Sequence, residues 1–261
     1  MSEKTTHVFT AIVIPLGIGL LAGLSSGLFG VGGGLIMVPL FVYLLKLDQK
    51  RAHATSLAAV VPIAFVGALG YGNQGNVVIS AAVFVLAGSI IGATYGARLL
   101  QTISLPRIQI LFAAILIATA IRLVWSVAPT QLVHGLSSHV FLFGVGLASG
   151  VLSGLLGVGG GLFVVPALIT AAGLSSLEAR GTSLAAIVGT ALGGAITHVL
   201  RGNVEIRLAV LCGLSGIPGA FLGVIASHDV SESIAVRALA VLIVFVAVQQ
   251  LRSARRGLAA V

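Results

Sequence analysis

The stretch Gly30-Val31-Gly32-Gly33-Gly34 decides the fold, because it recurs as Gly157-Val158-Gly159-Gly160-Gly161, 127 residues later. Thr55-Ser56-Leu57-Ala58-Ala59 recurs at the same offset as Thr182-Ser183-Leu184-Ala185-Ala186. The offset also relates shorter blocks: Ser26-Gly27 to Ser153-Gly154, Pro39 to Pro166, Gly75-Asn76-Val77 to Gly202-Asn203-Val204, and Gly92 and Gly96 to Gly219 and Gly223. One ungapped offset through several separate blocks indicates an internal duplication.

The composition places both copies in a membrane. Of the 261 residues, 58% are hydrophobic and 8% are charged, whereas a soluble domain carries about 25% charged residues. So few charges cannot cover a water-facing surface, and lipid must solvate most of the protein. The basic excess, 14 Lys and Arg against 6 Asp and Glu, is spread singly between apolar runs. This spacing favours topology signals over a nucleic-acid surface.

The apolar runs predict an all-α polytopic membrane protein with five helical segments in each half. They lie near 8–29, 35–46, 53–72, 77–97 and 106–125 in the first repeat, residues 1–130, and near 138–156, 162–173, 181–199, 206–226 and 233–251 in the second, residues 131–261. A span needs roughly 20 apolar residues, and the second segment of each half is shorter. We therefore expect the first two segments to form a bent or partly re-entrant hairpin with the glycine stretch at its tip.

The basic residues predict the orientation. With the N-terminus in the cytoplasm, 11 of the 14 Lys and Arg fall on the inner side, and only Arg122, Arg180 and Arg237 fall outside. This bias follows the positive-inside rule and predicts that both termini are cytoplasmic. Each half then crosses the membrane an odd number of times, so the halves have inverted topology. Inverted repeats are a recurring plan of secondary transporters.

The two glycine stretches are candidate anion sites. Consecutive glycines leave backbone N–H groups uncovered, and each stretch precedes an apolar helix whose N-terminus carries a partial positive charge. The candidate binding residues are Gly32, Gly33, Gly34, Gly159, Gly160 and Gly161. The alternative is a tight turn that only allows helices to pack closely.

The repeated Thr-Ser pairs are the second candidate. Thr55-Ser56 and Thr182-Ser183 open the third predicted segment of their halves. Their hydroxyls can either cap that helix or face a ligand. Recurrence in both halves favours the ligand interpretation, since a pseudo-symmetric site takes equal parts from each half.

No Lys or Arg lies at mid-depth in a predicted segment. We therefore expect dipoles to hold the anion, namely loop N–H groups, helix N-termini and the four hydroxyls, with no buried cationic side chain. No Asp or Glu lies deep in a segment either, which leaves coupling to a proton or sodium ion open.

Two serine motifs resemble catalytic sites but lack their context. Gly23-Leu24-Ser25-Ser26-Gly27 fits G-x-S-x-G, yet it lies in an apolar helix with no strand before it. Gly213-Leu214-Ser215-Gly216 resembles the serine motif of rhomboid proteases, which need a histidine on a later helix. The only later histidine, His228, falls in a predicted loop. The single Cys212 excludes an internal disulfide and a zinc cluster, so we expect no enzyme activity, cofactor or metal.

The doubled Gly-x-Gly-Gly-Gly with its trailing Pro39 or Pro166, and the doubled Thr-Ser-Leu-Ala-Ala, resemble the sulfite exporter TauE/SafE family from about Val8 to Arg252. The resemblance implies a multi-pass inner-membrane transporter of small sulfur-containing anions such as sulfite, sulfoacetate or related organosulfonates. Its partners would be the anion and the lipid bilayer, with no nucleic acid.

Other functions stay open at this stage. One alternative is a transporter of another small anion, such as a carboxylate, and a weaker one is an intramembrane enzyme. The sequence leaves the anion, the direction of transport, the coupling ion, the depth of the glycine hairpins and the oligomeric state undecided.

Overall fold

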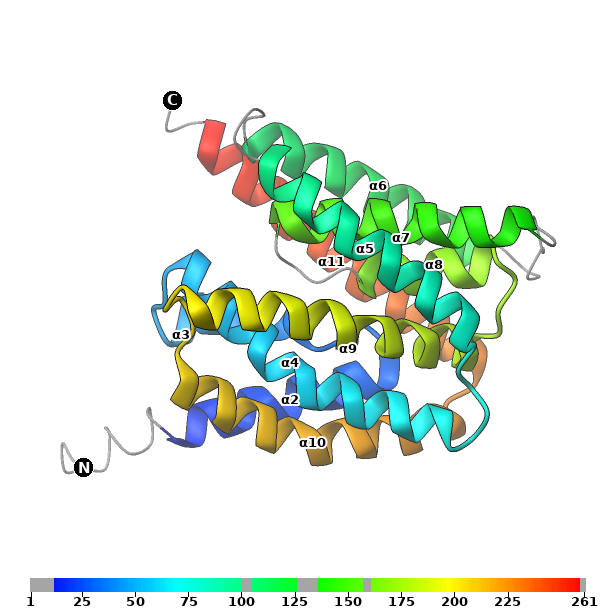
Figure 1. Ribbon diagram of the computed structural model, residues 1–261, viewed down its shortest axis with the longest axis horizontal. Helices are drawn as coiled ribbons and strands as arrows, with labels where there is room; N and C mark the ends of the chain where they lie inside the picture. Colours follow the sequence, from blue (N-terminus) through cyan, green and yellow to red (C-terminus); the bar gives the residue numbers. More distant parts are fainter. Residues whose placement is uncertain (1–11, 100–104, 126–135, 157–160, 259–261) are drawn as a thin grey trace.

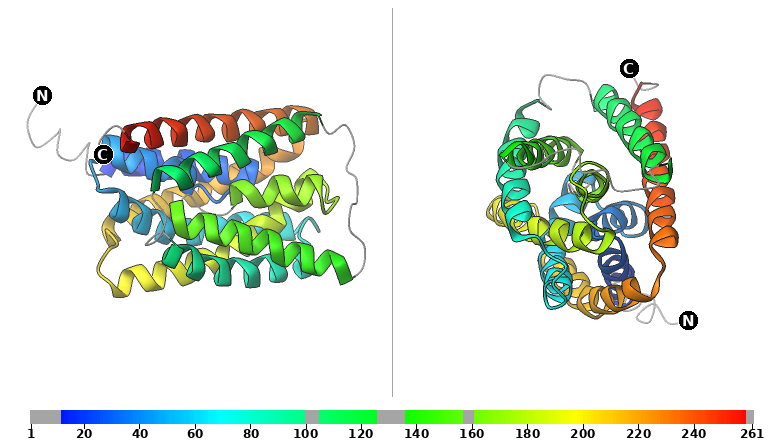
Figure 2. Two further views of the ribbon diagram at one scale, coloured as in Figure 1. Left: turned by 90° about the horizontal axis from the view of Figure 1, so that it is seen from above. Right: turned by 90° about the vertical axis from the view of Figure 1, so that its right-hand side faces the viewer.

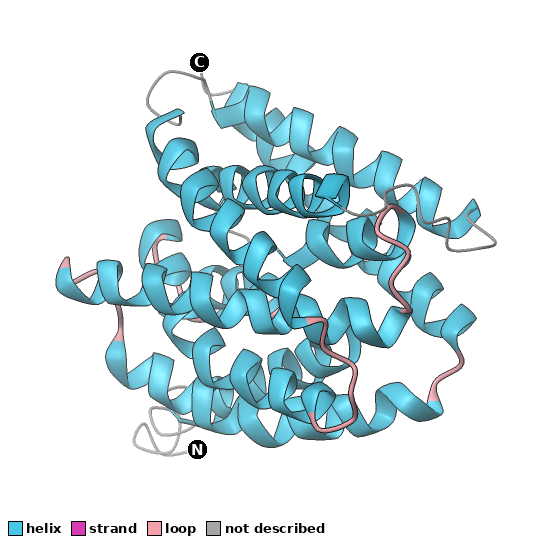
Figure 3. Ribbon diagram, turned by 45° about the vertical axis from the view of Figure 1, so that its right-hand side comes forward, coloured by secondary structure: helices cyan, strands magenta, loops and turns pink. Residues whose placement is uncertain are grey.

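The computed structural model describes residues 12–99, 105–125, 136–156 and 161–258, and within them it consists of helices joined by loops (Figure 1; Figure 3). The helices are α2 (Ile14–Phe29), α3 (Gly34–Leu44), α4 (Gln49–Gly72), α5 (Ile79–Leu99), α6 (Leu105–Trp125), α7 (Leu136–Leu156), α8 (Gly161–Thr170), α9 (Ser176–Leu200), α10 (Ile206–Asp229) and α11 (Glu232–Leu258). All ten predicted segments coincide with one of these helices, which confirms the all-α class.

Two helices begin earlier than the hydropathy predicted, because polar residues cap them. At α4, the Asp48 carboxylate accepts hydrogen bonds from the N–H groups of Lys50 and Arg51 at 3.0 and 3.1 Å. At α9, Ser175 and Glu178 form a reciprocal capping box. Each helix therefore begins with a polar first turn that precedes its apolar run.

α4 and α9 run antiparallel through the molecule. Near the start of α4, the Thr55 hydroxyl oxygen accepts a hydrogen bond from the N–H of Glu205, just beyond the end of α9, at 3.0 Å. Near the start of α9, the Thr182 hydroxyl oxygen accepts one from the N–H of Val78, beyond the end of α4, also at 3.0 Å. Thr182 and Glu205 are the repeat mates of Thr55 and Val78. Swapping the two halves therefore turns one hydrogen bond into the other. This is the relation expected of two halves related by an approximate two-fold axis and inverted with respect to each other.

Small residues pack the outer pairs, α2 with α10 and α5 with α7, and each pair joins one helix from each half. A methyl group at Gly23 would overlap the Gly216 backbone, and one at Gly150 would overlap the Ser89 backbone. These are equivalent contacts in the two halves. Similarly close contacts occur at Gly19, Gly92, Gly219 and Gly223. The GxxxG pairs Gly19/Gly23 and Gly219/Gly223 are therefore helix-packing faces.

The remaining long helices complete the bundle. α6 and α11, also repeat mates, lie side by side on one flank (Figure 2). The start of α2 and the end of α11 lie at the same end of the molecule (Figure 1). We call this end, where α4 and α10 also begin, the terminal end. The opposite end, where α5 and α9 begin, is the distal end.

The surface of the bundle suits lipid. Within the described residues, four helices are long and apolar enough to span a membrane: α4, α9, α10 and α11 up to Arg252. Large apolar side chains remain exposed along the helices, among them Leu21, Phe65, Leu111, Leu214 and Phe245. Exposure on this scale is unfavourable in water and favourable in hydrocarbon. The chain is therefore a multi-pass membrane protein.

Candidate functional site

The first glycine stretch forms the turn between α2 and α3. Gly30 ends α2 and Gly33 precedes α3, each with a φ of 72°, a left-handed conformation that glycine adopts without strain. A methyl group at Gly30 would lie 2.6 Å from the Cα of Arg180, and one at Gly33 would lie 2.8 Å from the carbonyl oxygen of Ala22. Because Ala22 is on α2, the chain doubles back at this turn, and α3 returns towards the terminal end.

The turn reaches the middle of the bundle. A methyl group at Gly32 would lie 3.1 Å from Cγ2 of Ile187 and 3.5 Å from Cγ1 of Val60. These repeat mates lie midway along α9 and α4. The start of α8 meets the same place, since a methyl group at Gly161 would lie 3.0 Å from the Cα of Val31. Elements of both halves therefore converge on this turn.

Backbone donors of the turn are unused. Among the described residues, the N–H groups of Val31, Gly32 and Gly33 have no hydrogen-bond acceptor. Gly34 and Gly161 are buried first residues of α3 and α8, so the start of each helix also points its partial positive charge into the interior. The predicted Gly159 and Gly160 lie outside the described residues.

Arg180 is the charged group of this site. It lies in the second turn of α9 with 2% of its surface exposed. One terminal nitrogen, Nη2, donates to the Ser176 hydroxyl at 2.7 Å, while Nε has no partner among the described residues. No carboxylate of those residues pairs with it. A buried cation, which we did not expect, therefore lies beside the glycine turn, because the Arg180 backbone packs beneath the turn at Gly30 and its guanidinium stays inside.

A tyrosine links this arginine to two neighbouring helices. The Tyr71 hydroxyl, fully buried near the end of α4, donates to the carbonyl oxygen of Gly27 on α2 at 2.7 Å. The same hydroxyl lies beside the Arg180 guanidinium and the Ser227 hydroxyl of α10. The Tyr71 ring centroid is 6.2 Å from that of His228, which lies in the last turn of α10 and not in the loop we predicted. The polar cluster thus extends from the glycine turn to the distal surface.

Two serines near the turn have fully buried hydroxyls without a partner in the described part of the chain, Ser26 and Ser183. Ser26 follows Ala22 by one helical turn, on the face of α2 that meets α3. Ser183 lies between Arg180 and Ile187 on one stripe of α9, and the glycine turn touches both ends of that stripe. With Arg180 Nε, these are all the buried unpaired side-chain atoms found in the described residues. They gather around one turn, although buried polar atoms are normally paired.

The predicted threonines make a contact that neither interpretation foresaw. Thr55 and Thr182 are fully buried, but they lie in the second turns of α4 and α9 and do not cap those helices. Their hydroxyls accept the N–H groups that precede α10 and α5 of the opposite half. They are therefore helix caps supplied across the repeat interface. Ser56, the mate of Ser183, is also buried, with 2% exposed.

Two histidines at the terminal end were not among the predicted site residues. The repeat mate of Arg180 is His53, and that of Tyr71 is His198. His53 lies in the first turns of α4, close enough to His198 for the two rings to interact electrostatically. Nδ1 of His198 is 3.5 Å from Nδ2 of Asn203. Comparing mates across the repeat, not only identical blocks, would have found both residues. Among the described residues, no group of three His, Cys, Asp or Glu side chains could hold a metal ion.

Known proteins resemble the chain over most of its length. The family model for "Sulfite exporter TauE/SafE" matches residues 3–123 and 142–260. A probable membrane transporter protein of Haemophilus influenzae is 34% identical over 75% of this chain and 76% of its own. One from Xylella fastidiosa is 28% identical over 85% of this chain and 87% of its own. One from Bacillus subtilis, YdhB, is 29% identical over 78% of this chain and 85% of its own.

Proposed function

The chain belongs to the sulfite exporter TauE/SafE family of membrane transporters, and from that premise we propose that it is a secondary transporter of a small sulfur-containing anion. The substrate class is sulfite, sulfoacetate or a related organosulfonate. The membrane is the inner membrane, with both termini in the cytoplasm, as the positive-inside bias predicts. Membership of a transporter family also means that the chain is not an enzyme.

The observation that carries this proposal is the buried Arg180 beneath the glycine turn, which forms an ion pair with no carboxylate of the described residues. A buried charge without a partner costs several kcal/mol of solvation, roughly, so proteins seldom keep one without a use. A bound oxyanion would neutralise the guanidinium and accept a hydrogen bond from its Nε–H group, which has no partner among the described residues. The unpaired hydroxyls of Ser26 and Ser183 and the free N–H groups of the turn would donate to the remaining oxygens.

The inverted halves support alternating access as the mechanism. The site lies where α4 and α9 cross, and the threonine caps tie each end of that crossing to the opposite half. If one half rocks against the other, the tie at one end loosens while the tie at the other end holds. The central anion would then face each side of the membrane in turn.

A carboxylate is the second candidate substrate. The guanidinium presents its planar fork to a carboxylate as well as to a sulfonate, so Arg180 alone does not separate them. A site that uses donors on several sides of the anion favours the three oxygens of sulfite or a sulfonate over the two of a carboxylate.

Calorimetric titration of the purified protein with sulfite, sulfoacetate, methanesulfonate and acetate tests the proposal. We expect the sulfur anions to bind more tightly than acetate. Arg180→Gln should weaken their binding by about tenfold to a hundredfold, because hydrogen bonds to a charged group contribute roughly 1.5–3 kcal/mol each. Arg237→Gln is the matched control, since Arg237 begins α11 at the same end and is exposed.

A structural role for Arg180 predicts a different result. If it only held the fold, Arg180→Gln would lower the melting temperature, and anion affinity of the remaining folded protein would equal that of the parent. If it binds the anion, the ligand-free variant should be at least as stable as the parent, because a buried unpaired charge has been removed. Parent-like sulfite affinity in folded Arg180→Gln would exclude the proposed site.

A further inference from the structure

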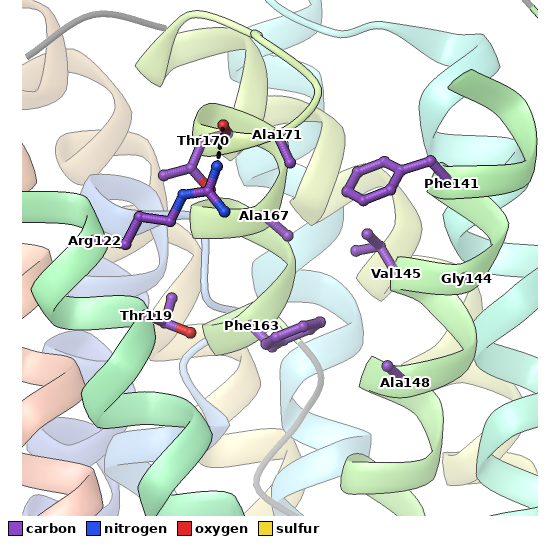
Figure 4. A pocket seen from close by; sticks show the side chains of 10 residues that line it. All are labelled: Thr119, Arg122, Phe141, Gly144, Val145, Ala148, Phe163, Ala167, Thr170 and Ala171. Carbon is purple, nitrogen blue, oxygen red and sulfur yellow. Dashed lines mark hydrogen bonds between the residues drawn. The ribbon is translucent and has the colours of Figure 1, made fainter. Parts of the chain in front are cut away.

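A cavity of about 400 Å³ lies between α6, α7 and α8, near the distal end. Figure 4 shows α8 between the other two helices, with Thr119 and Arg122 on the α6 wall and Phe141 and Val145 on the α7 wall. Its α8 lining is Phe163, Ala167, Thr170 and Ala171. This stripe differs from the one that carries the buried Gly161, Val165 and Leu168. The cavity is therefore separate from the glycine turn.

Among the described residues that line the cavity, Arg122 is the only charged one. It is exposed at the mouth of the cavity and donates one long hydrogen bond, from Nη2 to the carbonyl oxygen of Thr170 at 3.4 Å. The hydroxyls of Thr119 and Thr170 donate to backbone carbonyls of their own helices, at 2.7 and 2.8 Å. Because both hydroxyl protons are already donated, the Arg122 guanidinium is the group that can donate to an anion. The other walls are aromatic and aliphatic, which suits an apolar group.

Comparison with the first half shows how this cavity arises. In the equivalent position between α11, α2 and α3, Gln249 stands in place of Arg122. Larger side chains stand where the cavity has small ones: Leu21 for Ala148, Leu40 for Ala167 and Leu44 for Ala171. The three smaller side chains enlarge the space between α6, α7 and α8, and Arg122 adds a positive charge to it; the equivalent space of the other half has neither change. Because the repeat keeps its packing contacts elsewhere, the divergence points to a use of this cavity that the symmetric fold does not need.

We propose that the cavity binds an amphipathic anion, with its sulfonate, carboxylate or phosphate head at Arg122 and a short hydrocarbon tail between Phe141 and Phe163. Its volume lies in the range of small-molecule pockets, roughly 300–1,000 Å³, and exceeds what a bare oxyanion fills. The head lies at the last turn of α6, close to the distal surface. The tail can be that of a soluble alkanesulfonate or the first carbons of an anionic lipid.

The test uses the full chain in nanodiscs of zwitterionic lipid, titrated with 1-butanesulfonate. Methanesulfonate, which lacks the tail, is the comparison ligand. Arg122→Gln and Ala167→Leu give the cavity the residues that the first half already has at these positions. We expect each to weaken butanesulfonate binding at this site by about tenfold or more. Gln249→Ala, at the equivalent position, should leave it unchanged.

Two further arms identify the source of the ligand and separate the two sites. The first arm adds phosphatidylglycerol to the nanodiscs. The cavity would be assigned to a lipid if the parent protein then no longer binds butanesulfonate and if its retention of the lipid depends on Arg122. Arg180→Gln should leave the Arg122-dependent binding intact, so failure of the central site does not decide this one. If Arg122→Gln lowers only the melting temperature while both variants bind butanesulfonate and lipid as the parent does, Arg122 merely caps α8 and the proposal is wrong.

Discussion

The distal and terminal ends of the α4–α9 pair share one backbone plan but differ in charge. At the distal end, Arg180 of α9 lies beside Tyr71 of α4; at the terminal end, the equivalent positions are His53 and His198. The helix caps from Thr55 and Thr182 have the same length, 3.0 Å, at both ends. The duplication has therefore conserved the scaffold while the ionisable groups have diverged. A permanent cation occupies one end and a titratable one the other.

The neighbouring charged residues increase the electrostatic difference between the two ends. At the terminal end, His198 interacts with Lys50 and Arg201, so additional positive charge there meets repulsion. At the distal end, Arg180 meets hydroxyls and the glycine turn. We infer that the anion rests nearer Arg180, and that the histidine end provides a weaker or conditional counterpart.

The largest loss of stability is expected from a substitution at Gly30, where the glycine turn between α2 and α3 packs on Arg180. Gly30→Ala should destabilise the protein by about 3 kcal/mol. Left-handed backbone costs an alanine roughly 1–2 kcal/mol, and a methyl group 2.6 Å from the Arg180 Cα adds overpacking of about 1–3 kcal/mol. Denaturant titration in detergent measures the change.

Gly75→Ala is the control for Gly30→Ala. Its φ is 76°, but a methyl group there has nothing within 4 Å. The cost should be the backbone strain alone, roughly 1–2 kcal/mol. Equal losses at the two glycines would mean that the contact with Arg180 does not constrain the turn.

The second effect concerns charge. Arg180→His makes the two ends alike and should render anion affinity dependent on pH. Imidazole is charged below about pH 6.5 and neutral above it, so affinity falls as the pH rises. We expect methanesulfonate to bind roughly tenfold more weakly at about pH 8 than at about pH 6, since one charged hydrogen bond is worth about 1.5–3 kcal/mol.

Methanesulfonate suits this measurement because its own charge is constant over the pH range. The parent, with a guanidinium, should show little pH dependence. His53→Gln should leave the parent affinity near normal if Arg180 carries the binding. A strong pH dependence in the parent that His53→Gln removes would instead place the anion at the terminal end.

The third effect should be the same at both ends. Thr55→Val and Thr182→Val each remove an acceptor for an N–H group at the start of a helix of the opposite half. Each should destabilise the protein by about 1–2 kcal/mol and leave anion affinity nearly unchanged, because these hydroxyls serve the fold. Thr→Ser keeps the oxygen and should recover most of the loss. A large loss of affinity without loss of stability would return these threonines to the binding site.

Much of the fold was predictable from the sequence. The exact repeat of the Gly30–Gly34 block identified the duplication, and the alternation of basic residues indicated inversion. The start of α9 was placed too late, because Arg180 looked like the polar end of an apolar run. The Ser175-x-x-Glu178 capping box is a signal for an earlier start, and it would have put Arg180 inside the helix.

The site itself was less predictable. The glycines of the turn stood out because both halves carry them, whereas Arg180, Tyr71 and His53 differ from their repeat mates. Their importance follows from which helices pack together, and a single sequence does not contain that information. For the same reason, the Thr55 hydroxyl could be assigned a role only after Glu205, 150 residues away, was found beside it.

The smallest effect belongs to an ion pair that only the terminal end has. Arg51 Nη1 on α4 lies 2.7 Å from Glu205 Oε1 before α10. At the distal end the corresponding positions hold Glu178 and Val78, which cannot form such a pair. The side chains are 50% and 43% exposed, and exposed pairs typically contribute about 0.2–1 kcal/mol. Arg51→Gln and Glu205→Gln should therefore each cost little stability.

The informative quantity is the coupling between Arg51 and Glu205, measured by a double-mutant cycle at low and high salt. We expect it to be below about 1 kcal/mol and to shrink further at about 1 M salt, where the screening length is roughly 3 Å. The pair joins the two halves at one end only. In the alternating-access mechanism that we propose, even this small energy would favour closure of the terminal end. Disulfide trapping of each end would detect that bias. A coupling that is large and insensitive to salt would show that the pair is shielded from water in solution. The ion pair would then hold the terminal end closed strongly, whereas the exposure of its side chains predicts a weak interaction.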